Sequence, residues 1–199
     1  MSRSAREEGA IIPGVVSPPP DAAAEDPGAL ARALSGDDDP RLVLRALVPT
    51  DAAELRRIHL TPEVRRWWDE PASGFPGEEP DSTRFTIEFE GRVAGLIEYW
   101  EETEPKYRHA GIDLFLDPSL HGRGLGAAAI TRVVRHLIEE RGHHRITIDP
   151  ATGNVLAIRC YEKVGFRRVG VMRRYERDVD GDGWHDSLLM ELLSTDQRG

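Results

Sequence analysis

Residues 111–141 predict a strand, a tight glycine-rich loop and a helix in direct succession, and this unit restricts the fold more than any other part of the chain. In the strand, Ile112, Leu114 and Leu116 alternate with Asp113 and Phe115, which gives it two different faces. The helix is expected from about residue 124 to residue 141. Its apolar positions follow the spacing of a core-facing stripe: Ile130, Val133, Val134, Leu137 and Ile138.

Further strands and helices are predicted on both sides of this unit. The strands cover about 41–45, 85–89, 93–100, 144–149, 166–176 and 186–193, and residues 71–82 form a loop. One helix follows a cap at Thr50 or Asp51, a short one follows Thr61-Pro62, and another spans about 153–163 and stops at Gly165. The expected fold class is α/β, with a mixed sheet in one domain over 40–195 and helices on both faces.

Residues 1–39 have the composition of a tail. They contain three Arg against eight Asp and Glu, and the runs Pro18-Pro19-Pro20 and Asp37-Asp38-Asp39, but few large apolar residues. Such a segment buries too little surface to offset its ordering entropy. We expect a flexible leader, with an arm that packs on a partner subunit as the alternative.

Bulk properties exclude several function classes. The net charge of −9 argues against a nucleic-acid partner, which needs clustered Lys and Arg. No run of apolar residues is long enough to span a membrane, the N-terminus has no signal-peptide core, and Cys160 is the single cysteine, so a cytoplasmic protein is expected. The histidines lack zinc spacing, residues 178–183 read as a hairpin rather than a calcium loop, and His143-His144 are expected at the surface.

The loop itself suggests a phosphate-bearing ligand. The first amides of a helix lack intrahelical partners and its dipole makes that end positive, while glycines let a pyrophosphate approach the backbone closely. No Lys-Ser or Lys-Thr pair follows the glycines and the dinucleotide spacing is absent, so nucleotide hydrolysis is a poor interpretation. A glycine-rich turn without a ligand is the alternative.

Residues 121–126 resemble the coenzyme A pyrophosphate loop of the GCN5-related N-acetyltransferases, whose pattern is Gln/Arg-x-x-Gly-x-Gly/Ala. His121 stands where that family has Gln or Arg. The resemblance implies acetyl-CoA as cosubstrate, with no metal. It also implies cofactor contacts from the strand end and the loop: Leu114, Phe115, Leu116, His121, Gly122, Arg123, Gly124, Leu125 and Gly126.

Residues 154–166 match a second element of the same family, Asn-x-x-Ala-x-x-x-Tyr-x-x-x-Gly-Phe. Asn154 and Tyr161 are two helical turns apart and share a face that can line a long thin ligand. A phenol can donate a hydrogen bond or a proton to the thiolate that leaves when an amine attacks a thioester, so Tyr161 is the candidate acid. Tyr161 as an anchor between helix and sheet and Asn154 as a plain cap are the alternatives. Cys160 is interpreted as a small packing residue.

The chain resembles the aminoglycoside 6'-N-acetyltransferases over roughly residues 41–193. The shared landmarks are Trp67-Trp68, 111–113, 124–126, Asp149-Pro150 and 157–163. The resemblance implies that Asp113 and Asp149 hold the amine and that one of them accepts its proton through water. A polycationic substrate needs carboxylates and aromatic faces, which adds Trp67, Trp68, Glu98, Trp100 and Asp186 as candidates. Packing of the Trp pair in the core or at a subunit interface, and a solvated role for the glutamates at 98–104, are the alternatives.

These features predict transfer of an acetyl group from acetyl-CoA to a primary amine of a cationic small molecule, with an aminoglycoside as the leading candidate. Asp113 and Tyr161 are the expected catalytic residues, and backbone N–H groups of Phe115 or Leu116 the expected oxyanion donors. The alternatives are another amine, such as a protein N-terminus, a lysine-type metabolite or another amino-sugar, or a non-catalytic acyl-CoA-binding module. A homodimer is left open.

Overall fold

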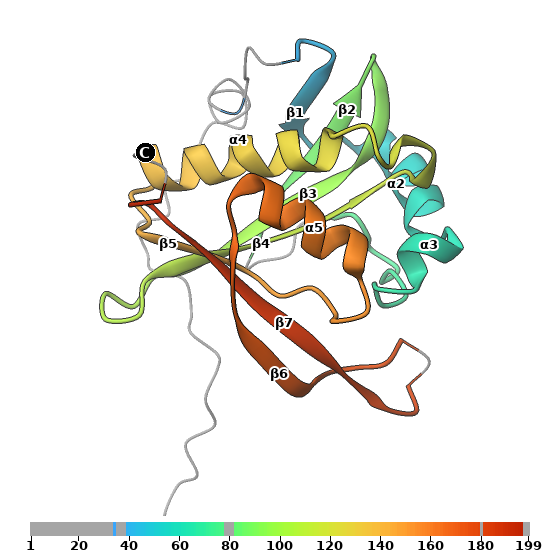
Figure 1. Ribbon diagram of the computed structural model, residues 1–199. Coiled ribbons are helices and arrows are strands. Elements are labelled where there is room, and N and C mark those ends of the chain that lie inside the picture. The colour runs from blue at the N-terminus through green and yellow to red at the C-terminus, as the bar shows by residue number, and fades with distance from the viewer. Residues whose placement is uncertain (1–33, 35–38, 78–81, 180, 197–199) are drawn as a thin grey trace, which may run out of the picture.

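A computed structural model describes Leu34 and residues 39–77, 82–179 and 181–196. The strands form one sheet in the order β1-β2-β3-β4-β5-β7-β6 (Figure 1). Their bounds are β1 Leu42–Ala46, β2 Thr83–Phe89, β3 Arg92–Glu102, β4 His109–Leu116, β5 Arg145–Ile148, β6 Arg167–Arg177 and β7 Trp184–Leu193. The helices are α2 Ala52–His59, α3 Pro62–Arg65, α4 Leu125–Glu139 and α5 Val155–Val164, with 3-10 turns at Pro49–Asp51 and Pro118–Leu120.

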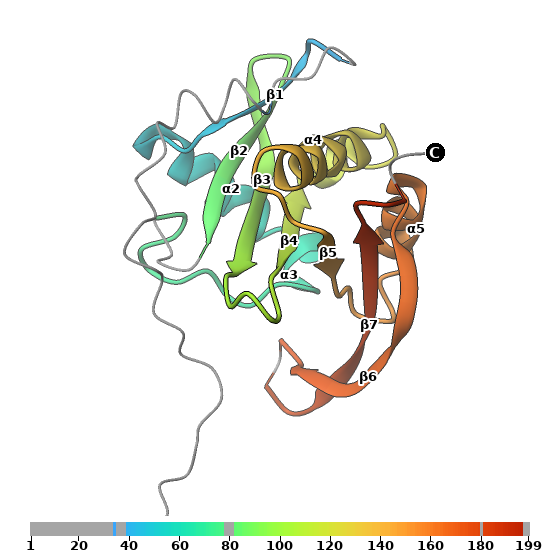
Figure 2. The same cartoon turned by 90° about the vertical axis from the view of Figure 1, so that its left-hand side faces the viewer.

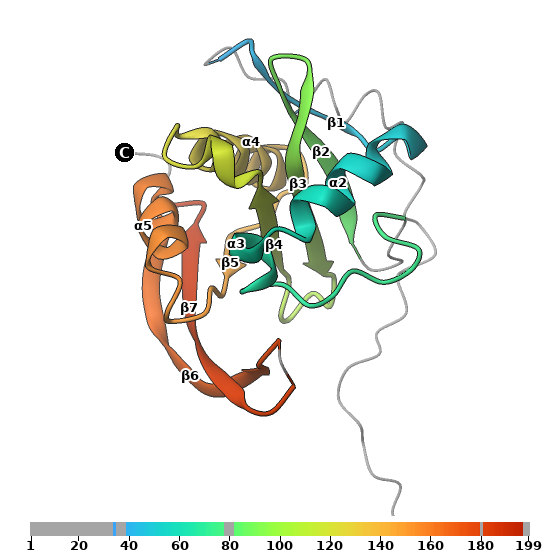
Figure 3. The ribbon, with the colours of Figure 1, turned by 90° about the vertical axis from the view of Figure 1, so that its right-hand side faces the viewer.

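Helices cover both faces of the sheet, as the sequence predicts. On one face α4 and α5 pack with Ile112 and Ile146 into the larger apolar cluster. On the other face α2 and α3 pack with Leu96 and Phe115 into the smaller one. Figures 2 and 3 show these two layers from opposite sides. The fold is the expected mixed α/β sheet with helices on both faces. Successive residues of β4 point to opposite faces, so Ile112 belongs to the larger cluster and Phe115 to the smaller one.

Neighbouring strands run antiparallel except β4 and β5, which run parallel. The β4–β5 ladder is short: among described residues it joins Ala110 to Ile146 and Gly111 to Thr147. Beyond these pairs the strands separate, and Figure 2 shows the β6–β7 hairpin standing apart from the β1–β4 part of the sheet. This separation places the ends of β4 and β5 at an opening in the sheet.

Two local expectations change in the structure. Asp51 occupies the cap position of α2, but its carboxylate makes no capping hydrogen bond; it accepts from Arg45 and Thr86 instead. His143 is buried rather than at the surface, because its imidazole packs beside Glu101; its neighbour His144 is exposed as expected. A charged partner on a strand decides both cases, Arg45 on β1 for Asp51 and Glu101 on β3 for His143, and alternation or capping patterns do not indicate such pairs.

The expected tail lies mostly outside the described residues, and its boundary at residue 39 stays a prediction. Two residues of that segment contact the domain: Leu34 is fully buried in the larger cluster, and the Asp39 carbonyl accepts a hydrogen bond from Arg132. None of the helices in the described ranges is both long and apolar enough to cross a bilayer.

Candidate active site

Asp113 and Asp149 lie where β4 and β5 separate. Each is two residues beyond the last paired residue of its strand, Gly111 on β4 and Thr147 on β5. Paired residues point to the same face of a sheet, and side chains alternate, so both aspartates are on the face that carries Phe115. The structure thus brings together the two carboxylates that the sequence singles out.

The same face carries a row of charged positions across neighbouring strands. Glu98 on β3 is directly opposite Asp113, and Arg84 on β2 is directly opposite Glu98. The Arg84 guanidinium donates to the Glu98 carboxylate, with 2.5 Å between Nε and Oε2, and Ser82 Oγ donates to the same oxygen at 3.1 Å. Glu98 therefore lies beside the two aspartates with its own cation.

Asp113 is held in an environment that disfavours its charge. Burial is the main cause that raises the pKa of Asp113 to about 7, and the negative charges of Asp149, Glu98 and Glu176 add to the effect. Burial also raises the pKa of Asp149, while a hydrogen bond from Tyr175 opposes that rise. A carboxyl group that titrates near neutrality suits a general base, which works best when its pKa is close to the operating pH.

Aromatic side chains border Asp113 along the same face. On one side the Phe115 ring meets Trp68 and His59, each with ring centroids 5.2 Å apart. On the other side Trp100 lies over Gly111, where an added Cβ would be 2.2 Å from the indole Cε2. Trp68 thus packs within the smaller apolar cluster, whereas Trp100 is partly exposed beside the carboxylates.

Tyr161 extends from α5 towards this carboxylate group. Its side chain is buried and its ring centroid is 6.3 Å from that of Phe166. Burial is the main cause that raises the pKa of Tyr161 above its ordinary value, and Asp113 and Asp149 raise it further. The phenol therefore stays protonated, and it can donate a hydrogen bond near the carboxylates. Burial also raises the pKa of the neighbouring Cys160 thiol, which fits a packing residue.

The glycine-rich loop joins β4 to the start of α4. Gly122 and Gly124 have φ of +76° and +84°, a left-handed conformation that strongly favours glycine, and Gly124 is the N-cap of α4. The amides after Gly124 begin a helix of 15 residues, so their unpaired N–H groups point out of its N-terminus. Gly126 has another role: a Cβ there would approach Leu116, Cys160 and Leu114, so this glycine lets α4 pack closely on the sheet and on α5.

Most other residues expected to bind the cofactor could contact it only through the backbone. Leu114 and Leu116 pack in the larger cluster, Phe115 in the smaller one, and Leu125 is buried. The Arg123 guanidinium lies over the Phe89 ring, 5.3 Å from its centroid. His121 Nε2 is 3.3 Å from the Leu116 carbonyl, which can only accept, so His121 links the loop to the strand end.

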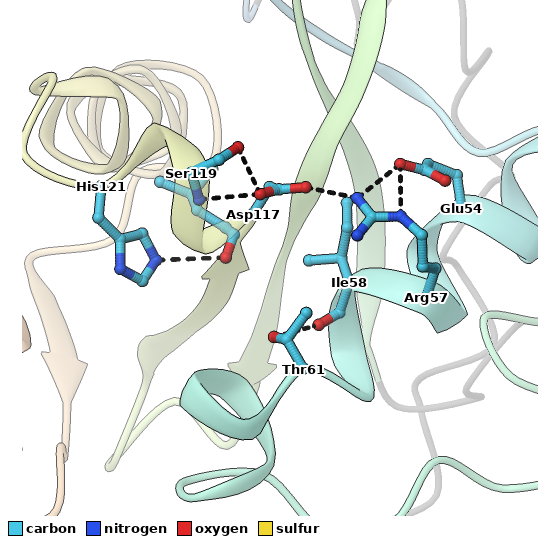
Figure 4. Close-up of polar contacts among 8 residues, drawn as sticks. Glu54, Arg57, Ile58, Thr61, Asp117, Ser119 and His121 are labelled. Carbon is cyan, nitrogen blue, oxygen red and sulfur yellow. Dashed lines mark hydrogen bonds and ion pairs between the residues drawn. The ribbon is translucent and has the colours of Figure 1, made fainter.

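The strand end is also tied to α2, as Figure 4 shows. Asp117 accepts hydrogen bonds from the Ser119 amide at 2.9 Å and from the Ser119 hydroxyl at 2.6 Å. Its other oxygen accepts from Arg57, which also donates to Glu54 at 2.7 Å. Nothing in the local sequence around Asp117 indicates this contact. The structure shows that Asp117 fixes the loop against α2.

Asn154 caps a helix, which was one of its two expected roles, and it keeps a donor group for the other, a contact with a ligand. It is the N-cap of α5, and its side-chain oxygen accepts from the Ala157 amide at 3.2 Å. Its side-chain NH2 group is a separate donor. Capping thus holds Asn154 at the end of the helix that carries Tyr161. A contact with the cofactor stays a prediction.

A cleft of about 900 Å³ opens between α3, the loop at 151–153 and the β6–β7 hairpin. Of the residues expected at the substrate, Trp67 and Asp186 line it, and a Cβ on Gly153 would be 3.4 Å from the Trp67 ring. Its charged lining residues also include a set that the sequence analysis did not single out for this role: Arg65, Arg66, Asp178, Asp182 and His185. Within the described ranges, no group of three or more His, Cys, Asp or Glu side chains could hold a metal ion.

The acidic residues at the end of β3 do not converge on the site. Glu101 pairs with Arg141 at 2.8 Å and with His143 at 2.6 Å. Burial alone would raise the pKa of Glu101, but these hydrogen bonds outweigh burial and lower it to about 2. Glu101 also alternates with Glu98, so it belongs to the opposite face. Glu101 therefore faces away from Asp113, whereas Glu98 is directly opposite it, and a contact of Glu98 with substrate stays a prediction.

Two residues next to the carboxylates escaped the sequence analysis. Tyr175 on β6 hydrogen-bonds to Asp149, which raises the pKa of Tyr175 in addition to the effect of burial. Glu176 contributes negative charge at Asp113. The sequence signals β6 only as a strand, so the position of these residues follows from the hairpin that brings β6 towards the end of β5.

Comparisons with known proteins find similarity to acetyltransferases. The family model described as "Acetyltransferase (GNAT) family" matches residues 44–166. An aminoglycoside N(6')-acetyltransferase type 1 of Klebsiella pneumoniae is 42% identical over 76 residues, which is 37% of each chain. The chain thus spans little more than a third of that curated relative.

Other relatives differ in their named activity. The N-alpha-acetyltransferase RimI of Mycobacterium tuberculosis is 31% identical over 80 residues, 40% of this chain and 48% of the relative. Among solved structures, the aminoglycoside acetyltransferase AAC(6')-Ib in complex with coenzyme A and kanamycin aligns with a TM-score of 0.64 at 24% identity. That alignment covers 78% of this chain and 96% of the other. The last comparison shows a shared fold.

Proposed function

The chain belongs to the acetyltransferase (GNAT) family, and from this membership we propose that it transfers an acetyl group from acetyl-CoA to a primary amine of a cationic small molecule. The observation that carries the proposal is the pair Asp113 and Asp149 at the point where β4 and β5 separate, with Tyr161 beside them. A half-buried carboxylate pair attracts a cation, and a phenol next to it supplies a hydrogen-bond donor.

The cosubstrate is assigned to the loop and to α5. The left-handed glycines and the N-terminus of α4 offer backbone N–H groups and a positive dipole, which suit a pyrophosphate. Acetyl-CoA supplies the activated acetyl group as a thioester. Asn154 and Tyr161, from the start and the last turns of α5, lie on the helix that would border its pantetheine arm. The side-chain contacts of His121 and Arg123 leave the phosphate contacts to the backbone.

Proton transfer is assigned to the carboxylates. The amine attacks the acetyl carbonyl only in its neutral form, so a base must take its proton. Asp113 is our candidate, directly or through water, because its raised pKa of about 7 makes it a stronger base than an ordinary aspartate. Asp149 is our candidate for holding the amine: burial raises its pKa, the hydrogen bond from Tyr175 favours its ionised form, and a bound cation would favour that form further.

Tyr161 is assigned to the departing thiolate. Its pKa is raised by burial, so at neutral pH it carries its proton and can donate a hydrogen bond to sulfur. The same rise makes full proton transfer less favourable, since an ordinary thiol has a pKa of about 8.5. The phenol therefore stabilises the leaving group mainly by hydrogen bonding, and solvent protonates the thiolate after release.

The substrate class rests on charge and aromatic surface. Asp113, Asp149 and Asp186 together with Trp67 and Trp100 provide carboxylates and aromatic faces, the combination that recognises a cationic, hydroxyl-rich amine. An aminoglycoside is our leading candidate, supported by the named activity of the Klebsiella relative. The RimI relative favours a peptide α-amine as the second candidate. Cytoplasmic location and a homodimer stay predictions.

One experiment tests both the activity and its base. The purified chain is incubated with acetyl-CoA and kanamycin, a peptide with a free α-amine, or a lysine-type diamine, and thiol release is followed. We expect turnover with kanamycin, and a loss of about 10²–10⁴-fold in Asp113→Asn with coenzyme A binding unchanged by calorimetry. Glu139→Gln, an exposed carboxylate on α4, is the matched control and should behave as the parent protein.

The outcomes separate the alternatives. Full turnover in Asp113→Asn would remove that residue from the mechanism. Turnover with the peptide alone would favour the second candidate. Coenzyme A binding without acetylation of any amine would favour a non-catalytic module.

A further inference from the structure

The alignment of Arg84 with Glu98 depends on an irregularity in the β2–β3 hairpin. From the turn, Phe89 pairs with Arg92 and Glu88 with Val93, but the next pair is Ile87 with Gly95. One extra residue on β3 shifts the register from there on, and this shift puts Arg84 opposite Glu98. Without it, Arg84 would face Ile97, because a shift of one residue moves a side chain to the other face.

The Arg84–Glu98 ion pair lies beside the carboxylate of Asp113. Arg84 and Glu98 each expose only 13% of their side chains, so the contact is largely shielded from solvent. Glu98 is in turn directly opposite Asp113. Like charges at directly opposite positions of two strands repel each other, and partial burial strengthens the repulsion.

We propose that Arg84 is a positioning residue for acetyl transfer: its ion pair with Glu98 offsets part of the negative charge directly across the strand from Asp113. This inference rests on the proposed role of Asp113 as base. Arg84 thereby sets the pH above which Asp113 is ionised, without touching the substrate.

Other charged and titratable groups also act on Asp113. Asp149 follows β5, Glu176 and Tyr175 come from β6, and Tyr161 comes from α5. The carboxylates among them raise the pKa of Asp113, as burial does. Glu98 would add its full charge if Arg84 did not pair with it. Substitutions in the Arg84–Glu98 ion pair should therefore change the charge that acts on Asp113.

Charge-removing variants test the proposal through the sign of their effects. Arg84→Gln leaves Glu98 without its cation, so the midpoint at which Asp113 ionises should rise by about one pH unit. Glu98→Gln removes the carboxylate directly opposite Asp113 and leaves the Arg84 charge in place, so the midpoint should fall by a similar amount. The double variant Arg84→Gln/Glu98→Gln removes both charges and should return close to the parent value.

Two readouts are measured on each variant. The first is the carboxyl titration of Asp113 by 13C NMR in the full chain without substrate, assigned by its loss in Asp113→Asn. The second is the pH profile of kcat/KM for acetyl transfer. Arg84→Lys keeps the charge and should restore the parent midpoint. Arg168→Gln removes an arginine from the exposed pair with Glu162 and should leave both readouts unchanged.

Opposite shifts with restoration in the double variant support the proposal, because a general loss of folding would move both single variants the same way. Unchanged Asp113 titration in folded Arg84→Gln and Glu98→Gln would overturn it. If the NMR midpoints shift as expected while the kinetic profile does not, the charge effect of Arg84 stands and the role of Asp113 as base fails.

Discussion

Asp113 and Asp149 occupy matching positions on two neighbouring parallel strands, each two residues past the last pair of a short ladder. Continued pairing would have used the backbone of both strands in hydrogen bonds. Their separation instead opens the sheet where the carboxylates lie, so one structural feature makes room for a ligand and supplies the groups that would act on it.

The first prediction concerns how the ionisation of Asp113 lowers the free energy of unfolding. Its pKa is raised to about 7 from an ordinary 3.8, so between these values the folded state holds a proton that the unfolded state has lost. Stability therefore falls as the pH rises through this window. Asp113→Asn should stabilise the fold by up to about 4 kcal/mol at pH 8 and by almost nothing at pH 4, as measured by urea unfolding. Equal stability at pH 8 would contradict the raised pKa.

The second prediction separates Tyr161 from the base. Tyr161→Phe removes the hydrogen bond to the leaving thiolate but keeps the ring that packs beside Phe166. We expect kcat to fall by about 10²-fold, with the acidic limb of the pH profile unchanged, because that limb reports Asp113. Steady-state kinetics of thiol release measure both. A normal rate at every pH would exclude Tyr161 from the reaction.

The third prediction addresses the contact between Gly111 and Trp100. A Cβ on Gly111 would overlap the indole, with 2.2 Å to Cε2, so Gly111→Ala should destabilise the fold by about 1–3 kcal/mol. Trp100→Ala removes the overlapping ring. In that background Gly111→Ala should cost much less, and thermal unfolding of the four proteins gives the coupling. Additive effects would mean that the indole moves aside freely.

The fourth prediction tests the buried carboxylate of Asp51. It accepts from Arg45 at 2.6 and 2.8 Å and from Thr86 at 2.7 Å, and the pKa of Asp51 is lowered to about 2, with the Arg45 hydrogen bonds as the largest cause. Its contribution is complete above about pH 4 and is lost as the pH falls through 2. Asp51→Ala should cost about 3–5 kcal/mol at pH 7. Glu54→Gln, from an exposed pair, should cost less than about 1 kcal/mol by the same denaturant titration.

The order of the elements and the faces of the strands follow from local sequence patterns. Alternation placed Asp113 and Phe115 on the face opposite to that of Ile112, and α5 ended at Gly165 as expected, where the structure has a left-handed conformation. The glycines of the loop marked the start of α4. These features depend on residues close in the chain, through side-chain period, steric limits and the unpaired amides of a helix end, so a single sequence carries them.

Which distant residues meet depends on how the strands pair in the folded chain. One extra residue in β3 puts Arg84 opposite Glu98, and the β6–β7 hairpin brings Tyr175 to Asp149. Glu101 turns to His143 instead of joining the carboxylates. Strand register and pairing are settled by contacts between segments far apart in the chain, and a one-residue shift reverses every side chain, so local patterns leave them open. Local patterns therefore predict the residues of the site, whereas long-range strand pairing fixes the register that brings them together.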